Sequence, residues 1–125
     1  MEEELRTLIA GLAGPGTTVD WAARPRGAAL PGVVLTLVSD VSGHTHSGPD
    51  GLSEARVQVD VYAPTFAAAK RLARALRAGL DGHSDGVMGA VFFAMARDTV
   101  EEGETPDQRV YRSMLDFTVW HSVAQ

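Results

Sequence analysis

The chain has 125 residues, a formal net charge of −5 and no cysteine, which excludes a disulfide framework, a thiolate metal site and a cysteine nucleophile. A hydrophobic fraction of 45% and a charged fraction of 22% are typical of one folded globular domain, which we place over residues 1–125. The negative charge argues against generic nucleic-acid binding, and no apolar run approaches the roughly 20 residues that span a bilayer. Because the N-terminus is acidic where a secretory signal would be basic and then apolar, we expect a cytoplasmic protein.

The first predicted element is a helix over residues 2–13. Apolar residues recur there at helical spacing, and three glutamates occupy the first turn, where the helix dipole favours negative charge. A short extended piece is expected around residues 18–21. The stretch 24–31 is rich in proline and glycine, which predicts an irregular loop.

The segment 33–39 is nearly continuously apolar and rich in β-forming residues, which predicts a strand covered on both faces. A polar connection follows over residues 40–53, longer than a hairpin needs. Loops of about a dozen residues without structure of their own are uncommon in compact domains, and are more often used for contacts or disordered. We therefore expect this connection to project from the domain.

Residues 55–80 predict a strand that runs directly into a helix. Val57, Val59 and Val61 alternate with polar residues, as pleating requires when only one face of a strand meets a core. After Pro64 the apolar residues recur with the helical period of about 3.6 residues. They form a stripe along one side of the helix. The other side, here called the basic helix side, carries Lys70, Arg71, Arg74 and Arg77.

Two further strands are predicted after this helix. A turn is expected at residues 81–86, then a strand over 87–97, an acidic loop over 98–107 and a last strand over 108–121. Residues 82–86 fit the G-x-S-x-G pattern of serine hydrolases, in which a strand precedes the serine and a helix follows it. Here a helix precedes and a strand follows, so the pattern predicts an ordinary turn.

The order of predicted elements is therefore helix, strand, strand, helix, strand, strand. It predicts an α+β domain in which an antiparallel sheet of about four strands is packed by helices on one face.

Three segments carry a resemblance to a known family. They are residues 24–31 (RPRGAALP), residues 55–62 (ARVQVDVY) leading into residues 67–69 (AAA), and residues 110–121 (VYRSMLDFTVWH). In this pattern the chain resembles, over essentially its whole length, the small tail-completion or tail-terminator (neck) proteins of long-tailed phages and gene transfer agents. None of the three segments is a catalytic signature.

The resemblance implies a structural virion protein that is not an enzyme and needs no cofactor. It implies a ring, a hexamer, that caps the last disc of the tail tube and offers a surface to the head connector. The implied partners are copies of itself, the tail tube protein and the head–tail connector protein, with DNA passing through the lumen without sequence-specific binding and no membrane contact. The implied location is the tail of a virion or virus-like particle assembled in the bacterial cytoplasm.

Charged and aromatic residues supply candidate contacts for such an assembly. The basic helix side has a counterpart of opposite sign, an acidic loop made of Glu101, Glu102, Glu104 and Asp107. A head-to-tail contact between the two would set register more than affinity, and the basic helix side could instead face DNA in a ring lumen. The alternative is that both are solvated surfaces with weak intrachain pairs.

Tyr62 and Trp120 are the aromatic candidates for an interface, because they fall on strand sides shared with polar residues. The alternative is that they fill the core, as most aromatic residues do.

His44 and His46 suggest an alternative function for the chain, based on metal binding. At a spacing of two they could share one side of an extended segment, with Asp40 or Asp50 completing a metal site. No third ligand has a fixed spacing, so a polar solvated loop, or a subunit or tube contact, explains them as well. The alternative function is a small-molecule-binding or metal-dependent α+β enzyme domain, and a further one is another head–tail connector protein.

Overall fold

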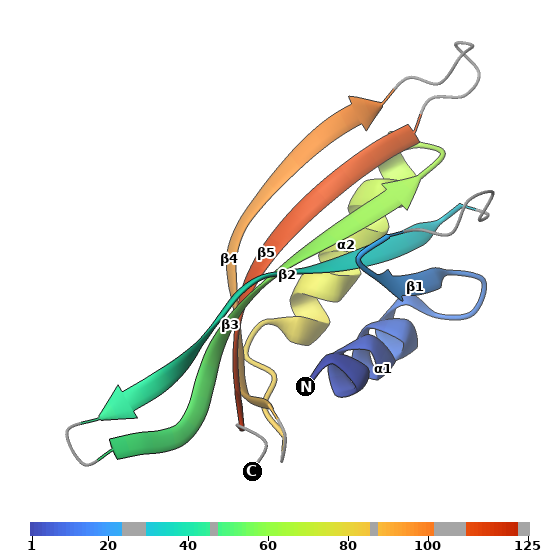
Figure 1. The fold of residues 1–125 in the computed structure, drawn as a ribbon. Coiled ribbons are helices and arrows are strands. Elements are labelled where there is room, and N and C mark those ends of the chain that lie inside the picture. Colours follow the sequence, from blue (N-terminus) through green and yellow to red (C-terminus); the bar gives the residue numbers. More distant parts are fainter. Residues whose placement is uncertain (24–29, 46–47, 86–87, 102–109, 123–125) are drawn as a thin grey trace.

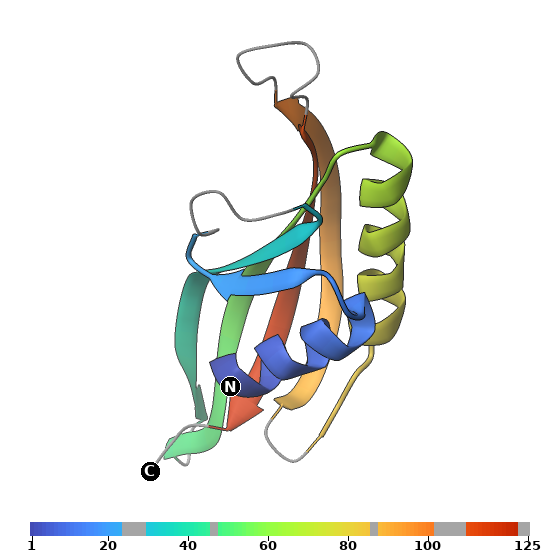
Figure 2. The same cartoon turned by 90° about the vertical axis from the view of Figure 1, so that its right-hand side faces the viewer.

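The computed structural model describes residues 1–23, 30–45, 48–85, 88–101 and 110–122. Two helices lie on one face of a five-stranded sheet, and the other face carries no described helix (Figures 1 and 2). In chain order the elements are α1 (Glu2–Ala13), β1 (Thr18–Trp21), β2 (Gly32–Thr45), β3 (Gly48–Ala63), α2 (Phe66–Leu80), β4 (Met88–Glu101) and β5 (Val110–Ser122). Neither described helix has the length and apolarity needed to cross a membrane.

The sheet order is β1-β2-β3-β5-β4. The pairs β2–β3, β3–β5 and β5–β4 are antiparallel, whereas β1 pairs parallel to β2. The α+β class is confirmed, but a sheet of four antiparallel strands is wrong, because β1 adds a fifth strand and makes the sheet mixed. The extended piece expected around residues 18–21 is confirmed as β1. With one buried apolar side chain, Val19, its pattern is too short to predict that it joins the sheet.

The predicted polar connection at residues 40–53 is wrong as an irregular loop. The ladder between β2 and β3 continues from Asp40 opposite Ala55 out to Thr45 opposite Gly48. Main-chain groups form this ladder, so it does not need the apolar alternation by which strands are recognised. The segment does project from the body, as a two-stranded ribbon (Figure 1). β4 likewise continues through Glu101, so the first residues of the predicted acidic loop belong to a strand.

The core lies between the sheet and the two helices. Val57, Val59 and Val61 of β3 point into it, as their alternation predicts, and the stripe of α2 packs against them. Thr65 caps α2 by accepting a hydrogen bond from the Ala68 amide at 3.1 Å. The other buried side chains of this core include Leu5 and Ile9 of α1, Leu76 and Leu80 of α2, Val33 and Leu35 of β2, Val91 of β4, and Leu115, Phe117 and Val119 of β5.

The prediction that the strand at 33–39 is covered on both faces is right for its first half only. Val33, Val34 and Leu35 are buried, but Leu37 is 40% exposed and Val38 is 58% exposed. β1 lies beside β2 only from Gly32 to Leu35, so the strand loses that neighbour where its apolar side chains become exposed.

Candidate functional site

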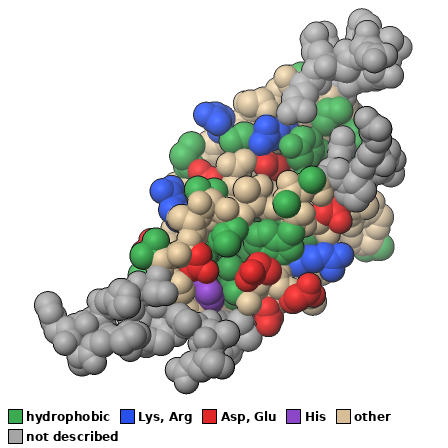
Figure 3. Space-filling view, in the orientation of Figure 1, with side chains coloured by type: hydrophobic (Ala, Val, Ile, Leu, Met, Phe, Trp, Pro, Cys, Tyr) green, Lys and Arg blue, Asp and Glu red, His purple; other side chains and the backbone are tan. Residues whose placement is uncertain are grey.

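The face of the sheet without described helices, here called the helix-free face, turns toward the viewer in Figures 1 and 3. It is built from the positions of β3, β5 and β4 that alternate with the core positions. Hydrophobic side chains and side chains of both charges are interspersed over it (Figure 3). Such a mixture is common to ordinary protein surfaces and to non-obligate interfaces, so the individual side chains decide between the two.

A buried carboxylate organises one end of the helix-free face. Asp60 of β3 is only 3% exposed. Arg112 of β5 binds it with both arms of its guanidinium, Nε to Oδ1 at 3.2 Å and Nη2 to Oδ2 at 3.1 Å, and Gln58 Nε2 donates to Oδ2 at 2.9 Å. The same guanidinium lies 5.6 Å from the centre of the Tyr62 ring. Bidentate pairing makes up for the lost hydration of a carboxylate and fixes Arg112 in place. No local sequence pattern predicts this pair, because the two residues are far apart in the chain.

Large apolar and aromatic side chains also lie on the helix-free face, among polar ones such as Arg56, Asp116 and Thr118. Phe92 and Met95 of β4 are about half exposed, and Trp120 of β5 is half-buried. Trp120 lies opposite Glu54 of β3, on the same side of the sheet as Tyr62. The predicted placement of Tyr62 and Trp120 on a face shared with polar residues is confirmed, and their role at an interface stays a prediction.

The basic helix side divides into two pairs. Lys70 binds Asp98 of β4 at 2.9 Å, and the Arg77 guanidinium lies 3.9 Å from the centre of the Phe93 ring, so both have partners within the chain. Arg71 and Arg74 are exposed and make no contact with an acidic side chain in the described part of the chain. These two guanidinium groups are therefore the ones left for a partner.

Asp98, the partner of Lys70, is itself held in place by a second hydrogen bond. The Ser113 hydroxyl donates to its carboxylate at 2.7 Å, and Lys70 donates to its other oxygen. The hydroxyl bond, followed by the ammonium, lowers the pKa of Asp98 below its usual value.

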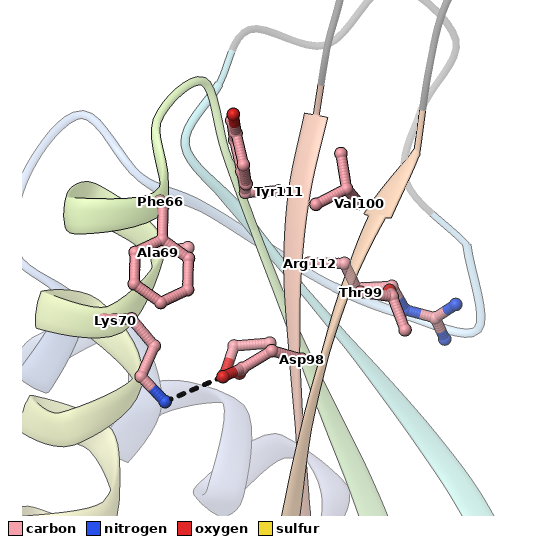
Figure 4. Close-up of a pocket in the computed structure, with 9 residues that line it drawn as sticks. Phe66, Ala69, Lys70, Asp98, Thr99, Val100, Tyr111 and Arg112 are labelled. Carbon is pink, nitrogen blue, oxygen red and sulfur yellow. Dashed lines mark hydrogen bonds and ion pairs between the residues drawn. The ribbon is translucent and has the colours of Figure 1, made fainter.

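A shallow groove lies between the start of α2 and the ends of β4 and β5 (Figure 4). Phe66 stands on the α2 side, while Val100 and Tyr111 stand on the strand side. The rings of Phe66 and Tyr111 meet edge to face with their centres 6.3 Å apart, yet Phe66 and Val100 remain more than half exposed. The groove is thus apolar and borders the edge of the sheet.

A second polar cluster lies under the base of the β2–β3 ribbon. His121 Nε2 lies 3.0 Å from Asp40 Oδ1, and the Ser53 hydroxyl donates to the same oxygen. Burial acts to raise the pKa of Asp40, but the bonds from Ser53 and His121 outweigh it, so the pKa is lowered. The acid lies between serine and histidine, whereas hydrolytic triads place the histidine between serine and acid. The cluster therefore links β2, β3 and β5, and no local sequence pattern predicts it.

The side chains of the remaining candidates lie outside the described part of the structure. His44 lies on β2 opposite Pro49, and Glu101 ends β4, but neither side chain belongs to the described part. His46, Glu102, Glu104 and Asp107 lie outside the described residues altogether. Among the residues that the structure does describe, no group of three His, Asp or Glu side chains is placed to hold a metal.

The G-x-S-x-G segment forms the turn that its context predicts. Residues 81–85 follow α2, Ser84 is exposed, and His83 pairs with Asp85 at 2.9 Å instead of with the serine. The geometry is that of a helix-to-strand turn.

The fold and its surfaces define a small α+β domain whose described residues expose apolar and charged side chains along a sheet, the character of a protein that acts by assembling with others. A family model for tail completion protein gp17 matches residues 3–122. The chain belongs to this family, which makes it a structural protein of a virion tail and confirms the resemblance inferred from its sequence.

Comparison with solved structures supports the fold. A chain from a structure titled "Virion of native gene transfer agent (GTA) particle" is similar with a TM-score of 0.58 and 21% sequence identity, over 92% of this chain and 84% of that chain. At this identity the likeness shows a shared fold. No curated protein matches the chain.

Proposed function

We propose that this protein is a tail terminator: copies of it form a ring, a hexamer, that caps the tail tube, stops its growth and presents a surface to the head connector. Membership of the tail completion family supports a tail role. The observation that carries the finer proposal is the exposure of large apolar side chains such as Phe92 and Met95 on a sheet face without a described helix. A soluble domain rarely exposes such groups together unless a partner covers them.

A ring requires that each copy use two different surfaces. Head-to-tail contacts repeated around a closing rotation give a cyclic ring, and each needs on the order of 1,000 Å² of buried surface. The sheet, with the ribbon at one end and the groove at the other, offers separate surfaces for this purpose (Figure 1). The free guanidinium groups of Arg71 and Arg74 supply a charged contact for an acidic neighbour or for DNA in the lumen.

Tube length tests capping directly. Tail tube protein is polymerised in the presence of increasing amounts of this protein, and tube lengths are measured by negative-stain microscopy. A terminator shortens the tubes as its amount rises and leaves a disc at one end. Tubes that grow to the same length at every ratio would contradict capping, and binding to the head connector without an effect on length would favour a connector protein.

A further inference from the structure

β2 and β4 are each covered on their outer side over the first part of the strand, and no described strand lies there over the rest, which is here called the free half of each strand. β1 covers β2 from Gly32 to Leu35. The turn after α2 covers β4: the Gly82 amide donates to the Val91 carbonyl at 2.7 Å, and the Asp81 carboxylate accepts from the Phe93 amide at 2.9 Å. Beyond Leu35 and beyond Phe93, no described strand lies on the outer side of either edge.

β2 and β4 also carry most of the exposed large hydrophobic side chains among the described residues. Among the described residues seven large hydrophobic side chains are exposed, and all but Phe66 lie on β2 or β4. The six are Leu37, Val38 and Val41 of β2, and Phe92, Met95 and Val100 of β4. Free strand edges usually carry charges or proline, which prevent pairing with other chains. Here Leu37, Val38 and Val41 of β2 lie at its free edge with a single carboxylate, Asp40, among them. The free half of β4 carries Met95 and Val100 together with the charged residues Arg97, Asp98 and Glu101, so the apolar contribution to pairing comes mainly from β2.

The strand directions and the two faces match for such a pairing. Because β2, β3, β5 and β4 alternate in direction, β4 runs opposite to β2. A neighbour that continues the sheet therefore presents its β2 antiparallel to β4. Leu37 and Val100 both belong to the side of the sheet that holds the helices, whereas Val41 and Met95 both belong to the helix-free face. Joined edges would thus bring exposed apolar side chains of the two copies together on each face of the sheet.

We propose that the free half of β4, Met95–Glu101, pairs antiparallel with the free half of β2, Thr36–Thr45, of the next copy, so that one sheet runs around the ring. This inference rests on the proposed ring. The two free halves lie at opposite ends of the molecule (Figure 1), so neighbours must be offset along their strands. Such a stagger, with tilted strands, is what closing a sheet into a barrel requires. Pairing of β4 with β4 would instead create a two-fold contact and stop at a dimer.

The absence of cysteine from the chain makes disulfide trapping a clean test. Val41 must lie opposite a residue of β4 on the same face, and successive residues on one face are two apart. Four double variants therefore cover the free half: Val41→Cys combined with Met95→Cys, Arg97→Cys, Thr99→Cys or Glu101→Cys. Directly opposed residues in an antiparallel pair approach closely enough for a disulfide. The matched control combines Val41→Cys with Thr118→Cys, which lies on the same face of the central strand β5.

Under mild oxidation, at least one double variant should give a ladder of covalent oligomers that ends at the closed ring. The single variants and the Thr118 control should give none. Light scattering of the unoxidised protein, alone and on tail tubes, separates the two proposals. A ring that none of the four variants traps overturns edge pairing and leaves the terminator proposal standing. Dimers from Met95→Cys alone overturn it in favour of two-fold pairing, and a monomer under all conditions overturns both proposals.

Discussion

The two faces of the sheet have the same strands but different chemistry. On the side of the helices, valine, leucine and phenylalanine side chains fill a continuous core. On the helix-free face, a bidentate ion pair, half-buried aromatic rings and exposed apolar side chains occur together. The core face supplies most of the packing that holds the fold, and the helix-free face adds the buried Asp60–Arg112 pair to it. The exposed apolar side chains of the helix-free face are the ones that we propose for assembly. Substitutions of buried and of exposed side chains should therefore affect different measurements.

The largest effect on stability is expected from Phe117→Ala. Phe117 is 2% exposed in the core and packs edge to face against Phe93 with ring centres 5.8 Å apart. Truncating a buried phenylalanine leaves a cavity and costs about 3–5 kcal/mol. Phe92→Ala, one strand away on the helix-free face, is the matched control and should cost less than about 1 kcal/mol while weakening ring formation. Urea unfolding and light scattering measure the two effects, and equal losses of stability would refute the division between the faces.

The next largest effect is expected from Asp60→Ala. The change leaves the partly buried guanidinium of Arg112 without its carboxylate, which costs about 3 kcal/mol. Asp116→Ala on the same face is the control, because Asp116 is half-buried and no ion pair holds it in the described part of the chain. It should change stability by less than about 0.5 kcal/mol. Similar urea midpoints for the two variants would show that the ion pair does not hold β3 to β5.

Asp40→Asn tests the cluster under the ribbon through its pH dependence. The lowered pKa of Asp40 means that its ionised form stabilises the fold above the ordinary carboxyl pKa of 3.8, and that this contribution is lost as the pH falls through the lower folded value. The variant should lose about 1 kcal/mol near neutral pH and should be less sensitive to acid below about pH 4. Thermal unfolding across this range measures it. Parallel stability curves for variant and natural protein would contradict the assignment.

The smallest effect on stability is expected from reversing Arg71 and Arg74. Both side chains are exposed, so the double change to glutamate should alter the free energy of unfolding by less than about 0.5 kcal/mol. Because charged surfaces steer association, it should slow ring formation about tenfold at low salt. Ala78→Glu adds a negative charge to the same helix without removing a guanidinium and is the control. Unchanged assembly kinetics by light scattering would show that this side of α2 is merely solvated.

Local patterns in the sequence correctly predicted the helices and strands whose own residues show a clear apolar period. The helix expected over residues 2–13 is α1, and the change of period after Pro64 marks the passage from β3 to α2. What could not be predicted depends on tertiary pairing. The extended piece expected around residues 18–21 is β1, but its parallel pairing with β2 as a fifth strand could not be predicted. The β2–β3 ribbon is held by main-chain hydrogen bonds, which its polar sequence does not reveal.

The same distinction holds for the candidate site. The alternation of β3 and β5 placed Tyr62 and Trp120 on the correct face. It could not predict that Arg112 reaches Asp60, or that Lys70 and Arg77 contact side chains of β4. Nor could it predict that Arg71 and Arg74 form no ion pair with the residues that the structure describes. Those facts require the register between strands and the position of α2 over them.

Cryo-electron microscopy of capped tube ends would show the proposed ring itself. We expect a closed ring of six copies at the terminated end of each tail tube, with the helix-free faces and strand edges buried in contacts. A tube end that carries a single copy or none, or a ring whose copies leave those faces and edges exposed to solvent, would contradict it.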